Sequence, residues 1–312
     1  MQAQDKLKEA KAYLEETLKE MPATLGLRER LAAVCLALGQ NDEALVRYQE
    51  ELKAGRVTPT LRLALARLAL DLGKIDLAQS EAKKVQDENP RNAEASYLLA
   101  RVHEARGELG AALAEYRRAL MWEKLPAYNY AYGRVLLKVG KEQEAYVALD
   151  AASSLPEARM ERGREFFRHG ELEKALEDFK EAANMLPTAA DPLIYEGFCY
   201  DKMGQQAKAE SAWRDAIRVA PDASEPHYRL GRQEMDRGRP AAAIEHFHKA
   251  VAKIPANASW ESELYFQLGQ AELLTGSKSA ALAAFKKYVE LAPQDAPSRP
   301  EAVRQVARLS NK

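Results

Sequence analysis

The sequence predicts an all-α protein made of about eight helix–turn–helix repeats, and two periodic features carry this prediction. The first is glycine at intervals of 34, 34, 33, 30, 34, 34 and 38 residues. The glycines concerned are Gly39, Gly73, Gly107, Gly140, Gly170, Gly204, Gly238 and Gly276. A fixed period of this length is typical of a solenoid, in which each repeat buries its apolar face by stacking on its neighbours.

The second periodic feature is an alanine five residues after each glycine, followed four residues later by a large apolar residue. In one repeat the large residue is replaced by a small one, Ala82. The large residues are Tyr48, Tyr116, Leu149, Phe179, Trp213, Phe247 and Phe285. Because these offsets follow the helical period, the alanine and the large residue lie on one face of a helix that begins after the glycine.

Four segments are expected in chain order. Residues 4–20 read as a lone helix within an N-terminal cap or partial repeat, 1–24. Two blocks of four repeats follow, 25–155 and 156–295. Residues 299–310 form an amphipathic helix that covers the last open face, within a C-terminal capping segment, 296–312.

The repeat that ends at Pro221 shows how each helix begins and ends. Pro192 suits the first turn of a helix, where its missing N–H costs nothing. Gly204 ends this helix, since glycine adopts the left-handed conformation of a helix C-terminus. A second helix carries Trp213 on its apolar face and ends before Pro221.

This pattern resembles the tetratricopeptide repeat, a 34-residue helix–turn–helix unit. Counting from repeat starts at residues 25, 59, 93, 126, 156, 190, 224 and 262, the small residue at position 8 is always alanine or glycine. The resemblance covers residues 25–295 and implies a right-handed superhelical solenoid with a concave groove that binds proteins. Arg159 and His227 depart from it, because the family prefers Trp or Leu at position 4.

Two repeats break the period. The repeat at 126–155 has only 30 residues, and we expect the loss at the loop 153–156 and in the first turn of the next helix. A missing turn there would divide the array into two blocks. Four extra residues near 256–261 lengthen either a loop or the start of a helix.

The resemblance implies that positions 5 and 9 of each first helix face the groove. Position 9 is arginine in five repeats: Arg67, Arg101, Arg134, Arg164 and Arg232. Position 5 supplies apolar or aromatic candidates: Leu63, Tyr97, Tyr130, Tyr228 and Phe266. Arginine binds carboxylates through two N–H groups, and aromatic side chains are common binding anchors. These residues therefore predict a site for a peptide segment with acidic and apolar residues.

An alternative interpretation needs no ligand. Position 2 is acidic in five repeats, and these acids could pair with the arginine one repeat before: Glu94, Glu157, Asp191, Glu225 and Glu263. The apolar residues at position 5 could equally pack on neighbouring helices. The leucine-rich helix around 61–72 is apolar nearly all round, which indicates burial or cover by a partner.

Composition and motifs narrow the function classes. The chain carries 46 basic and 47 acidic residues with neither half basic, which argues against nucleic acid as the main ligand. No apolar run is long enough to span a membrane. Cys35 and Cys199 fall in distant predicted helices, so we expect buried thiols. His246 and His248, two residues apart, face different sides of a helix.

With no phosphate loop, nucleophile elbow or metal-spaced cysteines, the sequence predicts no enzyme, no cofactor and no metal. The predicted function is a non-catalytic adaptor for a protein partner. The alternatives are a scaffold or homo-oligomer that self-assembles through the solenoid ends, and an accessory domain of a larger protein. The N-terminus lacks an apolar signal core, which fits a cytoplasmic protein. Loss of a targeting segment would instead allow a periplasmic or membrane-associated one.

Overall fold

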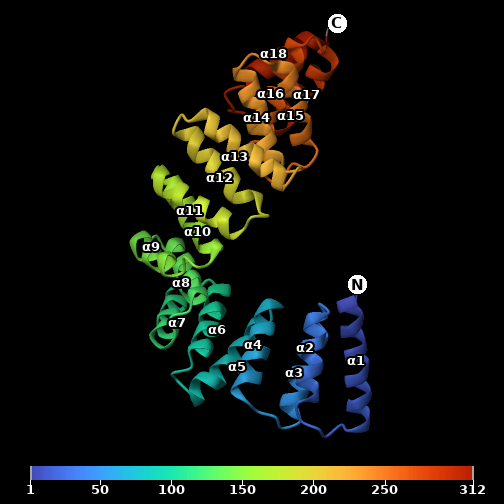
Figure 1. Ribbon diagram of the computed structural model, residues 1–312, viewed down its shortest axis with the longest axis vertical. Coiled ribbons are helices and arrows are strands. Elements are labelled where there is room, and N and C mark those ends of the chain that lie inside the picture. The colour runs from blue at the N-terminus through green and yellow to red at the C-terminus, as the bar shows by residue number, and fades with distance from the viewer. Residues whose placement is uncertain (1, 311–312) are drawn as a thin grey trace. The chain divides into compact units, whose positions relative to one another are not determined.

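The computed structural model describes residues 2–310, which form 18 helices and no strand (Figure 1). The predicted all-α fold is confirmed. The helices divide into two compact units, with the boundary between Ala158 and Arg159 inside the tenth helix. Within each unit, every repeat is a pair of helices, and the second helix of one repeat packs on the first helix of the next.

The first unit contains a lone helix and four helix pairs. Its helices are α1 (Gln2–Glu20), α2 (Leu27–Ala37), α3 (Asn41–Lys53), α4 (Pro59–Asp71), α5 (Ile75–Glu88), α6 (Ala93–Ala105), α7 (Leu109–Trp122), α8 (Pro126–Lys138) and α9 (Glu142–Ala151).

The second unit holds most of α10 and the remaining pairs. Its helices are α10 (Pro156–Arg168), α11 (Leu172–Met185), α12 (Ala190–Lys202), α13 (Gln206–Val219), α14 (Ser224–Asp236), α15 (Pro240–Val251), α16 (Glu261–Leu274), α17 (Lys278–Leu291) and α18 (Arg299–Ser310).

The recurring glycine forms the turn between the two helices of a repeat. Gly204 has φ +73°, and its N–H donates to the carbonyl of Asp201. The next N–H, of Gln205, donates to the carbonyl of Tyr200 at 2.8 Å. This pair of bonds satisfies carbonyl groups that the end of α12 would otherwise leave unpaired, and it requires the left-handed conformation that glycine adopts without strain.

The small residue at position 8 lets the two helices of a repeat approach closely. A Cβ atom at Gly197 would overlap the indole ring of Trp213 from α13. At Gly163 the same added atom would lie 2.8 Å from the ring of Phe179. The glycine therefore makes the space that the aromatic ring of the second helix fills.

Both ends of the solenoid are covered by single helices. α1 packs Leu14 and Leu18 against the core of the first repeat. At the other end α18 buries Ala302, and Arg299 donates through Nη1 to the carbonyls of Val289 (2.9 Å) and Ala292 (2.6 Å). This arginine therefore satisfies carbonyl groups at the C-terminus of α17.

The two breaks in the period have different structural forms. α9 has 10 residues, whereas α10 begins at Pro156 and keeps 13, the usual length of a first helix. The predicted loss in the first turn of that next helix is therefore wrong, because the residues are missing from the end of α9. The excess near 256–261 lies in the loop before α16, where Trp260 stacks on Tyr228 at 5.1 Å between ring centroids.

The leucine-rich helix α4 is buried inside the first unit. Leu61, Leu65 and Leu68 belong to its core, so packing within the unit accounts for the apolar character of this helix. Cys35 and Cys199 are both buried free thiols, as expected. In the part of the chain that the structure describes, no helix combines the length and apolarity needed to cross a membrane.

Candidate functional site

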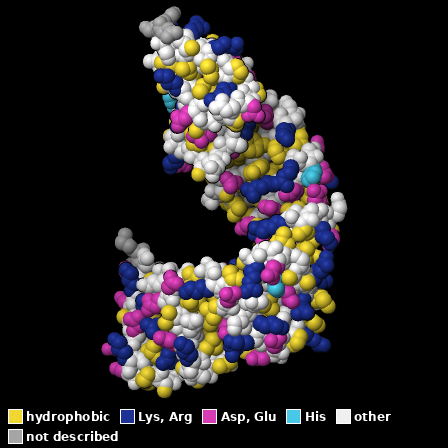
Figure 2. All heavy atoms as spheres, turned by 180° about the vertical axis from the view of Figure 1, so that it is seen from behind, with side chains coloured by type: hydrophobic (Ala, Val, Ile, Leu, Met, Phe, Trp, Pro, Cys, Tyr) yellow, Lys and Arg dark blue, Asp and Glu magenta, His cyan; other side chains and the backbone are white. Residues whose placement is uncertain are grey.

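The second unit contains a cleft of about 550 Å³ along its first helices. Basic and aromatic side chains from α10, α12 and α14 line it: Arg164, Phe167, Arg168, Tyr195, Phe198, Asp201, Lys202 and Arg229. Figure 2 shows basic, acidic and hydrophobic side chains interspersed over the face in view, without a large field of one sign. The cleft therefore concentrates cations locally in a chain whose formal net charge is only -1.

Each of three cations in this cleft lies over an aromatic ring. Arg164 is 5.1 Å from the centroid of Tyr195, and Lys202 Nζ is 4.3 Å from that of Phe167. Arg229 is 4.8 Å from the centroid of Phe198. The three rings themselves form a cluster with centroids 5.6 to 6.4 Å apart, in which Tyr195 meets Phe167 and Phe198 edge to face. Stacking of this kind holds a cation in place while leaving edge N–H groups available.

Few carboxylates neutralise these cations. The closest approach of Arg164 to Glu161 is 3.8 Å, beyond hydrogen-bond distance, whereas Arg229 pairs with Glu225 at 2.8 Å. Lys202 has no ion pair within residues 2–310. The Nε atoms of Arg164 and Arg229 are buried without a hydrogen-bond partner among the described residues. The cations of the cleft that no carboxylate of the described chain approaches within hydrogen-bond distance are therefore Arg164 and Lys202.

The groove of the first unit is different, because two of its three ladder arginines (position 9), Arg67 and Arg101, are paired with carboxylates. A cavity of about 630 Å³ includes Arg67, Glu94 and Arg101 in its lining. Arg67 forms an ion pair with Glu94, which is the predicted pairing with position 2 of the next repeat. Arg101 instead reaches back to Asp71, with 3.0 Å between Nη2 and Oδ1. Carboxylates of this unit therefore neutralise both arginines.

The other two ladder arginines are exposed and lie beside tyrosines of their own helices. Arg134 is 5.7 Å from the ring centroid of Tyr130 on α8, and Arg232 is 6.0 Å from that of Tyr228 on α14. Neither distance exceeds the range of a cation–π contact. These arginines are accessible to a ligand, although they do not line the cleft at α10 and α12.

The position-5 candidates differ in accessibility. Tyr97 and Tyr130 are half-buried, and Tyr97 stacks on Tyr128 with centroids 4.4 Å apart. Burial raises the pKa of Tyr97 above its ordinary value. The remaining candidates pack inside the repeats and expose at most 5% of their surface: Leu63, Tyr228 and Phe266. These three side chains could therefore contribute only to the floor of a groove.

The residues of the second-unit cleft that sequence reasoning did not select include Tyr195, Lys202 and Arg229. Tyr195 and Arg229 occupy position 6 of their repeats, and Lys202 occupies position 13. These positions lie three residues before and four residues after position 9, on the same helical face. The signal was therefore present in the sequence as basic and aromatic neighbours of the position-9 ladder.

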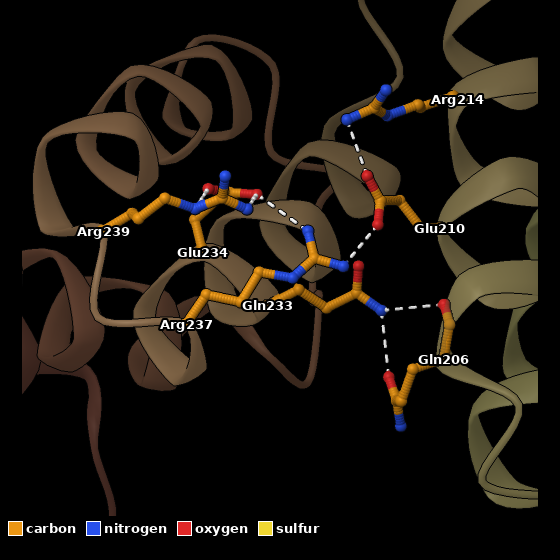
Figure 3. Close-up of polar contacts among 7 residues, drawn as sticks. All are labelled: Gln206, Glu210, Arg214, Gln233, Glu234, Arg237 and Arg239. Carbon is orange, nitrogen blue, oxygen red and sulfur yellow. Dashed lines mark hydrogen bonds and ion pairs between the residues drawn. The ribbon is translucent and has the colours of Figure 1, made fainter.

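A polar network holds α14, which carries Arg229 and Arg232, against α13 (Figure 3). Arg237 bridges the helices by pairing with Glu210 of α13 and with Glu234 of α14. Arg239 adds a second contact to Glu234, with 2.7 Å between Nε and Oε2. Gln233 Nε2 donates to Gln206 Oε1 at 3.0 Å. The hydrogen bond from Arg237 is the main cause that lowers the pKa of Glu210. The network fixes the position of α14 relative to the preceding repeat.

No group of three or more histidine, cysteine, aspartate or glutamate side chains arranged to hold a metal ion occurs within residues 2–310.

Family models and solved structures agree on the architecture. A model described as tetratricopeptide repeat matches residues 63–132 and 200–258, and a second model with the same description matches 262–295. Together they cover just over half of the chain. No curated protein matches the sequence.

Many solved structures are similar to the chain, and three of them show the extent of the likeness. A tetratricopeptide repeat protein from Parabacteroides merdae shares 16% identity, with a TM-score of 0.52, over 81% of this chain and 99% of its own. The C-terminal part of a repeat protein from Cytophaga hutchinsonii shares 15%, with a TM-score of 0.53, over 89% and 98%. A chain of the APC/C hetero-tetramer Cut9-Hcn1 shares 12%, with a TM-score of 0.52. That alignment covers 98% of this chain but 59% of the Cut9-Hcn1 chain.

Proposed function

Because the chain belongs to the tetratricopeptide repeat family, whose fold is that of a protein-interaction adaptor or scaffold, we propose that it is a non-catalytic adaptor. It holds a partner segment that carries acidic and apolar residues. The segment binds in the groove of the second unit, with its acidic residue in the cleft between α10, α12 and α14.

The observation that supports this proposal is the set of cations on aromatic rings. Arg164 and Lys202 are held over Tyr195 and Phe167, and neither has a carboxylate within hydrogen-bond distance in the described chain. A ligand carboxylate would accept charge-assisted hydrogen bonds from these groups. Since the side chains are already restrained, binding orders fewer rotatable bonds than it would for free arginines.

Apolar residues of the segment would lie on the exposed parts of Phe167 and Phe198 beside the cations. The cleft volume of about 550 Å³ is large enough for more than one side chain. Within the second unit, Arg232 extends the proposed binding surface. In the groove of the first unit, Arg134, Tyr97 and Tyr130 are the candidate contacts, whereas Arg67 and Arg101 contribute less because they are paired.

The experiment is a binding measurement on the full chain with a peptide array that varies acidic and apolar residues independently. Fluorescence anisotropy of the best labelled peptide then gives the affinity of the variants. We expect Arg164→Glu combined with Lys202→Glu to weaken binding at least tenfold, on the order of 1.4 kcal/mol or more. Peptides in which alanine replaces the acidic residues should bind no better to the wild type than to this variant.

The matched control is Arg218→Glu, a charge reversal at an exposed arginine of α13 that pairs with Asp215 outside the cleft. It changes the net charge in the same direction but should leave the affinity within about twofold, since exposed charges are screened by salt. Equal weakening by both changes would indicate nonspecific electrostatics, and an array without selective binding would end the proposal.

A further inference from the structure

One polar contact recurs between the two helices of a repeat. It joins position 4 of the first helix to a residue 19 positions later on the second helix. In the repeat that starts at residue 59 the pair is Arg62 with Glu81, and in the one at 156 it is Arg159 with Asp178. In the repeat at 224 the same two positions hold His227 and His246, with 3.0 Å between their Nδ1 atoms.

The acidic partners in the repeats at 59 and 156 are buried, with Glu81 5% and Asp178 1% exposed. In those repeats the contact joins opposite charges. Two histidines can form the same hydrogen bond only while at least one ring is neutral. The repeat at 224 therefore differs from the others in its response to protons.

The surroundings fix the tautomer of His227. Its Nε2 lies 3.2 Å from the carbonyl oxygen of Pro221. Because a carbonyl only accepts, this nitrogen carries the hydrogen, and Nδ1 of neutral His227 is an acceptor. His246 then donates from Nδ1 to His227 Nδ1. When both rings are neutral, each of these two contacts therefore joins one donor to one acceptor.

Protonation disfavours this arrangement in a way that depends on which ring takes the proton. A proton added to His227 must go to Nδ1, which then opposes the Nδ1–H of His246 at 3.0 Å. A proton added to His246 places a positive charge beside His227, which is only 3% exposed. In either case the contact loses its donor–acceptor match or gains a poorly solvated charge.

Charged groups on the surrounding helices do not offset the cost of protonating the histidine pair. Lys249 of α15 and Arg214 of α13 are cations that disfavour protonation of the pair. Glu234 of α14 favours it, but this carboxylate is already paired with Arg237 and Arg239. Glu272 of α16 faces His248 rather than the pair. Burial is the largest cause that lowers the pKa of both His227 and His246.

We propose that the His227–His246 contact is a pH-sensitive latch that holds α14 to α15 near neutral pH and releases it under mildly acidic conditions. α14 carries Arg229, so on the proposed function its release from α15 would also loosen one wall of the binding cleft. The latch itself does not depend on any ligand.

The direction follows from proton linkage. Both histidines have a folded-state pKa below 6.5, so the open state binds protons first as the pH falls. The contact therefore stabilises the closed state fully at a pH above the unfolded-state pKa of the histidines. This stabilisation is lost as the pH falls through about 6.5 towards their folded-state pKa values. The opening equilibrium therefore shifts towards the open state as the pH falls, because the open state binds more protons.

The test is hydrogen exchange on the full chain at pH 7.5 and pH 5.0, compared as protection factors so that intrinsic rates cancel. In the wild type we expect protection of α14 amides to fall at least tenfold more than that of α12 amides. The matched variant is His227→Leu with His246→Ala, which copies Leu193 and Ala212 at the equivalent positions of the preceding repeat. In this variant α14 and α12 should respond alike.

A second variant should reverse the direction in which α14 protection changes with pH. His246→Glu pairs a carboxylate with His227, as in the repeats at 59 and 156, and should make α14 protection greater at pH 5.0 relative to α12. Histidine ring NMR titration of the wild type reads the same contact without any substitution. Equal responses of α14 and α12 in the wild type, or titration of both rings at an ordinary pKa near 6.5, would overturn the latch. No ligand enters this test, so it can fail independently of the adaptor proposal.

Discussion

The grooves of the two units carry arginine at the same repeat position but give it different neighbours. In the first unit Arg67 and Arg101 are paired with carboxylates of adjacent repeats. In the second unit Arg164 lies on the ring of Tyr195 and has no carboxylate within hydrogen-bond distance. An aromatic neighbour restrains a cation without neutralising it, so the type of neighbour determines which arginines remain able to bind an anion.

The same two units also differ in how a repeat is packed. Position 8 is alanine in the first three repeats and glycine in the others. In the second unit this glycine faces a phenylalanine or tryptophan ring, whereas in the repeat at 59 the two equivalent positions are both alanine, Ala66 and Ala82. The second unit therefore depends on close approach of backbone and ring, and the first unit depends less on it.

The largest expected effect tests this packing difference. Gly197→Ala places a methyl group where the Trp213 indole lies, and we expect a loss of about 3 kcal/mol in the free energy of unfolding, measured in urea. Gly110→Ala is the control in the first unit, since its Cβ would meet nothing within 4 Å. It should gain up to about 1 kcal/mol from helix propensity. Similar behaviour of the two variants would show that the helices separate freely.

The next effect concerns the buried ion pairs. Asp178→Asn removes the charge that accepts from Arg162 Nε (2.8 Å) and Nη2 (2.7 Å), and we expect it to cost about 2 kcal/mol of unfolding free energy. The counterpart Glu81→Gln in the first unit should cost about 1 kcal/mol, because its second cation, Lys84, is half exposed and can be solvated. A larger loss at Glu81 would reverse the comparison.

A smaller expected effect is a difference in peptide affinity between substitutions in the two grooves. Arg67→Glu should change the affinity for the array-selected peptide by less than about threefold, on the order of 0.6 kcal/mol, since this arginine is already paired with Glu94. The same substitution at Arg164 should exceed that change. Equal effects at both sites would place the anion-binding surface in both units.

The smallest effect is on stability. Arg67→Ala removes an exposed ion pair, and we expect less than about 0.5 kcal/mol change in unfolding free energy, falling further in 0.5 M salt. A loss above 1 kcal/mol that persists in salt would mean that Arg67 acts through packing of its alkyl chain instead.

The sequence predicted the parts of the fold that depend on local geometry. The turn at Gly204 and the apolar face with Trp213 follow from backbone conformation and helical period, which any single repeat reveals. The burial of Tyr228 did not follow, because its stacking partner Trp260 lies in a loop outside the period. The charge partner of Arg101 was also not predictable, since Asp71 competes with several acids at similar chain separation.

The site was predicted less completely for a related reason. Position 9 identified Arg164 from one helix alone. The cleft, however, is made by three successive first helices, and Lys202 and Arg229 enter it from positions 13 and 6. Which of several residues on a helical face meets the next helix depends on the packing between repeats, and this is a property of the pair rather than of either sequence segment.

The glycine beneath each aromatic ring also bears on how such an array can change over evolution. Gly197 and Trp213 are sixteen residues apart, and enlarging one without reducing the other produces overlap. The two positions must therefore vary together, whereas neither constrains the matching position of another repeat. Exchange of a whole helix pair preserves every glycine–ring fit, and exchange of a single helix breaks one. The natural unit of recombination in this chain is thus the repeat with its boundaries between helix pairs.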